Sequence, residues 1–406
     1  MFLCLANINK GITMKVETAK RIHSVKEYYF STKLREVAQL RKEGKPIINL
    51  GIGSPDMPPH ESVREKMASE ISKPEGHGYQ SYSGIPELRE AFSRWYQRQY
   101  SVEIDPEEDV LPLIGSKEGI MHISMAFLDP GDEVLVPNPG YPTYQSATRL
   151  AGGVNRPYIL KEEKDWMPDF DALEEEDLSR VKLMWVNYPH MPTGARGKEE
   201  LWKRLVDFGK KNNILICHDN PYSFILNPQP STIFSVEGAR DCCLELNSLS
   251  KSHNMAGWRI GAVVGSPKFL KEVIKFKSNM DSGMNRAAQL AAAVALDLDD
   301  DWYDSLNEVY HPRKEIAYQI LEELGCDYQK EQAGLFAWGK VPDTVKDGYE
   351  LSDRALYEAN VFITPGGIFG SGGDQYIRIS VCSGEEELME ALERVKGLVN
   401  DKIKAQ

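Results

Sequence analysis

The alternation of short apolar runs with amphipathic segments between residues 110 and 265 constrains the fold of this chain more than any other feature. Short apolar runs bounded by turn residues are typical of buried strands. The segment Glu199 to Asn212 places Leu201, Leu205 and Phe208 at helical spacing, with lysines and arginines on the opposite face. Strands that alternate with helices form a mostly parallel sheet covered on both faces. The predicted strands are Glu133 to Pro137, Val181 to Asn187, Ile214 to His218, Cys242 to Leu246 and Ile260 to Val264.

The pattern changes after about residue 300. A helical stretch is followed by a short apolar run at Gly334 to Trp338, a helix near residues 349 to 359, and a second run at Tyr376 to Ser380. This mixture predicts a smaller α+β domain. A length of 406 residues also favours two to three domains. We therefore expect an arm with part of the small domain over residues 1–50, a large domain over 51–295 and a small domain over 296–406.

Composition narrows the class of protein. The net charge of −13 argues against a nucleic-acid partner. The absence of an 18-residue apolar run argues against a membrane partner, and the apolar start Met1 to Ala6 is too short for a signal peptide. Six cysteines without a CxxC pair favour a reducing compartment, so we expect a cytoplasmic protein. The acidic clusters Glu174 to Asp177 and Asp299 to Asp301 are interpreted as turns or helix ends, and no metal site is predicted.

Polar residues follow several of the predicted strands. Sheets of this kind bind ligands in the crevice at the carboxyl ends of their strands. Gly115 to Lys117, Asp219, and Ser248 to Lys251 each stand directly after an apolar run. We therefore expect these residues to share one site.

The segment from Ser248 to Arg259 carries the most specific chemistry. A lysine after a buried strand, such as Lys251, can lose water contacts, which lowers its pKa and makes it a usable imine-forming nucleophile. Hydroxyl groups and the Arg259 guanidinium suit a phosphate. Taken alone, the pattern also fits a lysine that faces solvent.

The same segment, with Arg259 eight positions beyond Lys251, is similar to the signature of class I/II aminotransferases of pyridoxal-phosphate (PLP) fold type I. The resemblance covers residues 25 to 400. It implies a large domain with a mostly parallel seven-stranded sheet and a smaller C-terminal α+β domain. It also implies that Lys251 holds PLP as a Schiff base and later moves the proton between the substrate α-carbon and the cofactor. Ser248 and Arg259 would bind the phosphate.

Further motifs occur in the order expected from the resemblance. Asp219 would hold the pyridine nitrogen protonated, which makes the ring an electron sink, and Tyr222 would donate to the phenolic O3′. The main chain of Ser116 and Lys117 would grip the phosphate, as the start of a helix can. Without the resemblance, Asp219 and this glycine turn also fit ordinary helix caps.

Two tyrosines have other implied roles. Tyr141, in Pro137 to Tyr141, would stack on the pyridine ring, whereas Tyr144 is expected to pack in the following helix. Tyr79 would reach the phosphate in the neighbouring subunit's site, which predicts a homodimer.

Arg378, in Tyr376 to Ser380, matches the arginine that binds the substrate α-carboxylate through two parallel hydrogen bonds. Gly53 matches the glycine whose backbone lies against the same carboxylate. Without the resemblance, a surface ion pair and a simple turn would explain these two residues.

The chain departs from the pattern at one position. The usual Asn-Pro-Thr-Gly is replaced by Met191-Pro-Thr-Gly, so the amide that donates to O3′ is missing. Asn187, just upstream, is a candidate substitute. This change predicts a retuned cofactor site with PLP still bound.

The resemblance therefore implies an aminotransferase that moves an α-amino group between an L-amino acid and a 2-oxo acid. A PLP-dependent β-lyase shares nearly all of these residues and stays open. A PLP-binding regulator or sensor would need an attached DNA-binding domain, and only about 25 residues precede the region of resemblance. Residues Tyr28 to Ser31 are most similar to those of alanine, aspartate and LL-diaminopimelate aminotransferases.

Overall fold

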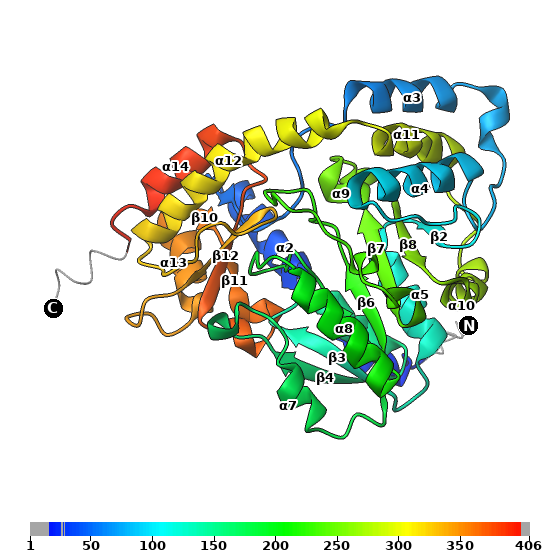
Figure 1. Ribbon diagram of the computed structural model, residues 1–406. Coiled ribbons are helices and arrows are strands. Elements are labelled where there is room, and N and C mark those ends of the chain that lie inside the picture. The colour runs from blue at the N-terminus through cyan, green and yellow to red at the C-terminus, as the bar shows by residue number, and fades with distance from the viewer. Residues whose placement is uncertain (1–15, 26, 28, 399–406) are drawn as a thin grey trace, which may run out of the picture.

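The computed structural model describes residues 16–25, 27 and 29–398 (Figure 1). Met1 to Ala6 and Tyr28 lie outside these residues. The centre of the fold is a seven-stranded sheet in the order β2-β8-β7-β6-β5-β3-β4. Strand β8 is antiparallel to both neighbours, and the other pairs are parallel. The α/β class and the mostly parallel sheet are confirmed. In sheet order, the strands are Val110–Leu113, Gly261–Gly265, Cys243–Ser248, Leu215–Asp219, Val181–Val186, Glu133–Asn138 and Val154–Ile159.

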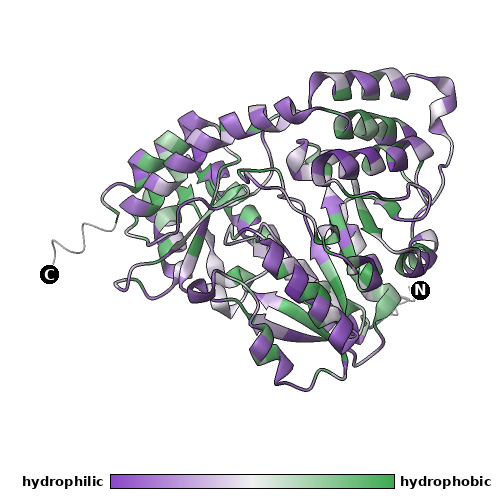
Figure 2. Cartoon of the chain, in the orientation of Figure 1, coloured by the Kyte–Doolittle hydropathy of each residue, from purple (hydrophilic) through white to green (hydrophobic). Residues whose placement is uncertain are grey.

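Helices cover both faces of this sheet because alternate strand residues are apolar on each side. In β5, Leu183 and Trp185 face one cluster, whereas Met184 and Val186 face the other. Helices α5 (Ser116–Phe127), α6 (Pro142–Leu150) and α10 (Pro267–Ser278) lie on the first side. On the second side lie α4 (Pro86–Tyr100), α8 (Glu199–Asn212) and α11 (Arg286–Leu296), with α3 (Glu61–Ile71) packed on α11. Figure 2 shows apolar central strands under helices with polar outer faces.

The smaller part of the fold contains two short sheets. Strands β11 (Thr364–Pro365), β12 (Tyr376–Ser380) and β9 (Phe336–Lys340) form an antiparallel sheet. Strand β1 (Ile48–Asn49) pairs in parallel with β10 (Val361–Phe362), so the N-terminal segment joins the C-terminal one. The division of the chain at residues 50 and 295 stays a prediction. The helices here are α2 (Tyr29–Lys42), α12 (Asp300–Glu323), α13 (Gly348–Ala359) and α14 (Glu385–Val395). The short helix α1 (Lys20–His23) instead contacts α6, on the large sheet.

Short elements complete the chain. Helix α7 (Phe170–Glu174) ends at the first acidic cluster and α12 begins within the second, so both clusters are helix ends, as predicted. Among the described helices, none is long and apolar enough to cross a membrane. The remaining elements are α9 (Leu249–Ser252) and the 3-10 helices Pro74–His77, Glu162–Lys164, Ile233–Ser235, Ala239–Asp241, Ala256–Trp258, Gly366–Phe369 and Ser371–Gly373.

Candidate active site

One cavity of about 540 Å³ lies where the carboxyl ends of the central strands meet the smaller part of the fold. Much of its polar lining comes from turns that follow β2, β5, β6 and β7, as expected at the carboxyl ends of parallel strands, and Arg378 comes from β12. Apolar residues that the sequence did not single out form a second wall: Phe30, Leu34, Ile52, Phe336 and Phe369. The predicted site residues that line the cavity are Gly53, Ser116, Lys117, Tyr141, Asp219, Tyr222, Ser248, Lys251, Arg259 and Arg378.

Lys251 lies in α9, directly after β7. Its Nζ donates a hydrogen bond to the carbonyl oxygen of Gly53 at 2.5 Å. Burial lowers the pKa of the Lys251 amine, and the guanidinium groups of Arg378 and Arg259 lower it further. A larger fraction of the amine is therefore neutral and nucleophilic at neutral pH.

Asp219 ends strand β6 and is 5% exposed. Its Oδ2 accepts a hydrogen bond from the Tyr144 hydroxyl at 2.8 Å. Its Oδ1 is buried and has no hydrogen-bond partner among the described residues. Burial raises the pKa of Asp219 to about 6, against the hydrogen bond from Tyr144 and the charge of His218. A buried acceptor facing the cavity fits the protonated ring nitrogen of PLP.

The turn between β2 and α5 forms a cradle for an anion. Gly115 has a φ of +82°, and a Cβ there would lie 2.1 Å from Nη2 of Arg259. Glycine therefore lets the guanidinium approach the start of α5 at Ser116 and Lys117. Arg259 is held by a hydrogen bond from Nη1 to the Ala256 carbonyl at 2.9 Å. The start of a helix and a guanidinium together fit the PLP phosphate.

Arg378 lies in β12 and is 4% exposed. Its Nη2 donates to the carbonyl oxygen of Gly51 at 2.8 Å, and its guanidinium carbon lies 3.8 Å from the centre of the Phe336 ring. A Cβ at Gly53 would lie 2.2 Å from the same ring, so the glycine makes room for Phe336. The arginine is thus held flat against the cavity wall, and its carboxylate-binding role stays a prediction.

Met191 contacts Arg378 directly, because its Sδ accepts a hydrogen bond from Nη1 at 3.2 Å. A thioether has no N–H or O–H to donate. The amide of Asn187 donates to the Asp219 carbonyl oxygen at 2.6 Å, and its Oδ1 accepts from the Met191 N–H at 2.8 Å. Asn187 therefore supports the backbone around Asp219, and this use of its amide argues against the substitute role.

Replacing Met191 with asparagine is expected to lower the pH midpoint at which the visible band of bound PLP titrates, by on the order of one unit. The new amide would add a donor beside Tyr222, and one hydrogen bond to a charged group contributes about 1.5 to 3 kcal/mol at most. Absorbance titration of both proteins measures the shift. Met191→Leu, which adds no donor, is the matched control, and equal midpoints in all three proteins would contradict the expectation.

Tyr144 packs in α6, as predicted, and stacks on Trp185 with ring centroids 5.1 Å apart. Its hydrogen bond to Asp219 was not predicted. The two residues are 75 positions apart, so no local pattern reveals the contact.

Tyr79 does not line the cavity of its own chain. Its side chain is 91% exposed, in a separate groove lined by residues 76–80 and 282–286. The role of Tyr79 in a neighbouring subunit stays a prediction.

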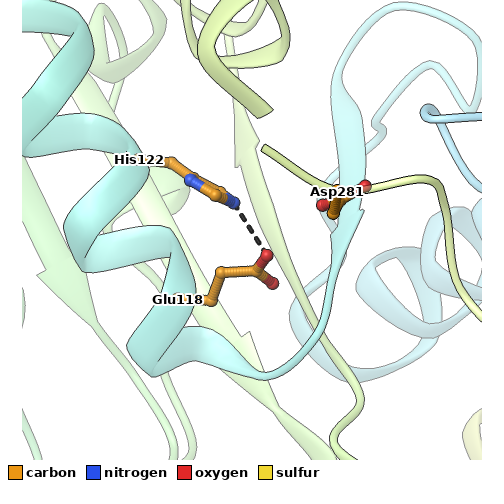
Figure 3. A group of neighbouring side chains, drawn as sticks. All are labelled: Glu118, His122 and Asp281. Atoms are coloured by element: carbon orange, nitrogen blue, oxygen red, sulfur yellow. Dashed lines mark ion pairs between the residues drawn. The ribbon is translucent and has the colours of Figure 1, made fainter. Parts of the chain in front are cut away.

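Glu118 and His122 of α5 form a cluster with Asp281, in which the histidine is buried and the two carboxylates are partly buried (Figure 3). Glu118 contacts Nε2 of His122 at 2.9 Å and accepts from the Ile114 N–H at 2.6 Å, which holds the turn before the phosphate cradle. The Lys277 ammonium already lies 2.9 Å from Asp281. This lysine supplies positive charge to the cluster, which we interpret as structural.

Comparison with known proteins agrees with this geometry. A family described as Aminotransferase class I and II matches residues 45–395. The chain is 40% identical over 384 residues to the LL-diaminopimelate aminotransferase of Aquifex aeolicus, covering 94% of this chain and 99% of that protein. The structure of substrate-bound BacF from Bacillus subtilis matches with a TM-score of 0.91 and 34% identity, over 95% of this chain and 98% of that one. A Thermus thermophilus aspartate aminotransferase mutant matches with a TM-score of 0.88 and 26% identity, over 95% of this chain and 100% of that one.

The match extends over most of the chain and includes every cavity-lining residue from Gly53 to Arg378. The chain therefore belongs to the class I and II aminotransferase family and is a PLP-dependent enzyme that moves an amino group between an amino acid and a 2-oxo acid.

Proposed function

We propose that Lys251, Asp219 and Arg378 carry the amino-group transfer of this enzyme. The observation that supports it is their convergence on one cavity, with a buried amine, an unpartnered carboxylate oxygen among the described residues and a guanidinium. PLP, when bound, supplies the electron sink that stabilises negative charge at the substrate α-carbon. The chain supplies the groups that hold the substrate and move its proton.

Each residue has a distinct task in this proposal. The neutral Lys251 amine takes the proton from the substrate α-carbon and later returns one. Asp219 holds a ring nitrogen in its protonated form, and Arg378 fixes the substrate by its α-carboxylate. The apolar wall of Phe30, Leu34 and Phe336 limits water in the cavity, which strengthens these charge interactions.

Two classes of amino donor have specific support. The first is LL-diaminopimelate, because the relative from Aquifex aeolicus is named an LL-diaminopimelate aminotransferase. The apolar wall instead favours an aromatic L-amino acid, because phenyl rings can pack against Phe30, Phe336 and Phe369.

A panel of amino donors under single-turnover conditions tests the function. The holoenzyme is mixed with LL-diaminopimelate, phenylalanine, tyrosine, aspartate or alanine, and the loss of its visible band is followed together with the 2-oxo acid formed. Stoichiometric oxo acid from any donor supports amino transfer. Release of ammonia and pyruvate from a cysteine conjugate, with no oxo acid from the panel, would support the β-lyase alternative and contradict the proposal.

We also propose that the enzyme is a homodimer in which Tyr79 contributes to the neighbouring site. Its 91% exposed ring, beside a groove of about 360 Å³, supports this. Sedimentation equilibrium would report a mass near twice 45.8 kDa, whereas a monomer would contradict the proposal.

Replacing Arg378 with lysine is expected to raise KM for both the amino acid and the oxo acid by about tenfold or more, because an ammonium cannot form two parallel hydrogen bonds with a carboxylate. Steady-state kinetics with both substrates varied measure the change. Arg94→Lys, in an exposed pair with Asp297, is the control. An unchanged KM for both substrates would remove Arg378 from carboxylate binding.

A further inference from the structure

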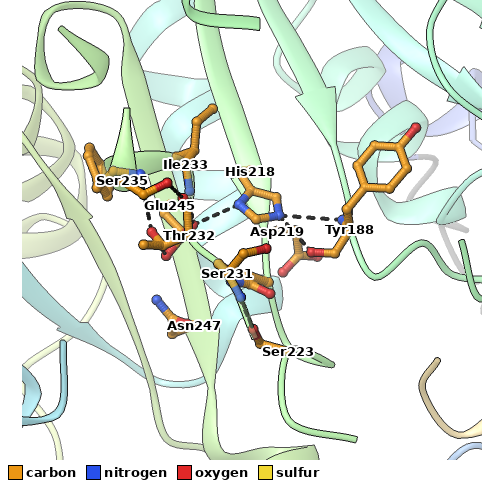
Figure 4. Close-up of polar contacts among 12 residues, drawn as sticks. Tyr188, His218, Asp219, Ser223, Ser231, Thr232, Ile233, Ser235, Glu245 and Asn247 are labelled. Carbon is orange, nitrogen blue, oxygen red and sulfur yellow. Dashed lines mark hydrogen bonds and ion pairs between the residues drawn. The ribbon is translucent and has the colours of Figure 1, made fainter. Parts of the chain in front are cut away.

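A fully buried ion pair lies directly behind Asp219. His218 in β6 and Glu245 in β7 are register partners, and both side chains are 0% exposed (Figure 4). Successive side chains of a strand point to opposite faces. Asp219 faces Tyr144 on the α6 side, whereas His218 faces Trp202 of α8 on the other side. The pair is therefore outside the cavity but adjacent to the residue that holds the cofactor ring.

Both ring nitrogens of His218 face acceptors. Nδ1 lies 2.7 Å from Oε2 of Glu245, and Nε2 lies 2.9 Å from the Tyr188 carbonyl oxygen. The Tyr188 N–H also donates toward Nε2, over a longer distance of 3.4 Å. Two acceptors require two N–H groups, which only the imidazolium has. The two shorter contacts of the ring, taken together, fit the imidazolium.

Glu245 is held as the matching anion by four donors. Its Oε1 accepts from the hydroxyls of Tyr96 at 2.6 Å and Thr232 at 2.8 Å. Its Oε2 accepts from His218 and from the Ile233 N–H at 3.2 Å. Burial opposes ionisation, but these donors, led by His218, hold the pKa of Glu245 below its usual value. A carboxylate with this many donors stays charged in the interior.

We propose that His218 and Glu245 are positioning residues whose buried imidazolium keeps Asp219 in the anionic form that a protonated ring nitrogen requires. The inference rests on the proposed role of Asp219. A cation beside a carboxylate favours its charged form, and the charge of His218 opposes the effect of burial on the pKa of Asp219. Glu245 would act through His218, by holding its second proton.

Other charged and titratable groups around these residues stay unchanged in the test. Behind the pair lie Tyr96 and Tyr100 of α4. Around Asp219, the cavity is lined by Lys117, Tyr141 and Tyr144, and by Tyr222, Lys251, Arg259 and Arg378.

The test measures PLP affinity against pH in apoprotein carrying Lys251→Ala, so that covalent attachment adds no pH dependence of its own. Affinity is read from quenching of tryptophan fluorescence between about pH 5 and pH 8. The parent is compared with His218→Gln/Glu245→Gln, which removes both charges and keeps polar side chains. We expect the pH midpoint for loss of affinity to rise by about one unit in the double variant.

Two further variants sharpen the result. Glu245→Gln alone keeps one acceptor oxygen, which Tyr96 and Thr232 can share, but removes the anion that holds the imidazolium. Its midpoint should therefore also rise. This single variant decides the question if the double variant does not fold. The control variant Arg89→Gln/Glu107→Gln removes a different ion pair, in which Nη1 of Arg89 lies 2.8 Å from Oε2 of Glu107. It should leave the pH midpoint unchanged.

A folded double variant with the parent's midpoint would overturn the inference and leave the pair purely structural. An equal shift in the Arg89→Gln/Glu107→Gln control would overturn it too, because loss of stability alone would then explain the effect. Failure of the wild-type apoprotein to bind PLP at any pH would overturn the proposed function, and this inference with it.

Discussion

Replacing Lys251 with alanine is expected to lower kcat by about 10⁴-fold while PLP still binds without covalent attachment. The variant keeps the phosphate cradle of Gly115 and Arg259 and the Oδ1 acceptor of Asp219, so the cofactor site remains. It loses the amine that we propose attaches the cofactor and moves the substrate proton. Single-turnover kinetics measure the rate, and the absorbance of the dialysed protein measures retained PLP.

Borohydride reduction of the wild-type holoenzyme provides the complementary measurement. Reduction should fix the cofactor on Lys251, and a peptide map should locate the label there. Lys275→Ala, on the exposed side of α10, is the matched control and should keep both the label and the rate. A label on any other lysine would refute the assignment of Lys251.

Replacing Asp219 with alanine is expected to weaken PLP binding and to lower the rate by roughly 10² or more, a loss of about 3 kcal/mol of transition-state stabilisation. Without its carboxylate, the chain would no longer hold the ring nitrogen of bound PLP in the protonated form, and the cofactor would supply a weaker electron sink. Stopped-flow absorbance with a saturating donor measures the rate. A near-normal kcat would exclude Asp219 from the mechanism.

Tyr144→Phe is the graded comparison for this variant. It removes the 2.8 Å hydrogen bond to Oδ2 but keeps the carboxylate and the stacking on Trp185. Its effect should be clearly smaller than that of Asp219→Ala. A loss as large as that of Asp219→Ala would mean that orientation of the carboxylate, rather than its charge, controls the rate.

The sequence predicts the central fold well because buried strands and amphipathic helices leave strong patterns. Helix α8 has the predicted bounds, and the five predicted strands differ from β3, β5, β6, β7 and β8 by one or two residues at their ends. Strand β4 was not predicted. It is an edge strand whose Val154 and Ile159 are 48% and 47% exposed, so it lacks the continuous apolar run of a central strand.

The site was partly predictable for a related reason. Residues that follow strands, such as Asp219 and Lys251, converge because parallel strands end at the same edge. The apolar wall was not predictable, since Phe30 and Phe336 reach the cavity from α2 and β9, far apart in the chain. The ion pair of His218 and Glu245 was not predictable either, because it depends on the register between β6 and β7, which the sequence pattern does not determine.

The buried carboxyl of Asp219 also affects how long the cofactor-free chain survives. The pKa of Asp219 is about 6 in the folded chain, against an ordinary value of 3.8. The folded state is therefore stabilised by the proton on this carboxyl at low pH, and this stabilisation is lost as the pH rises through 6. At neutral pH, the buried anion therefore costs the empty enzyme roughly 3 kcal/mol. A bound cofactor offsets this cost and adds its own binding free energy to the folded state. The supply of vitamin B6 would thus set how much of this protein escapes unfolding and proteolysis, as well as how much of it is active.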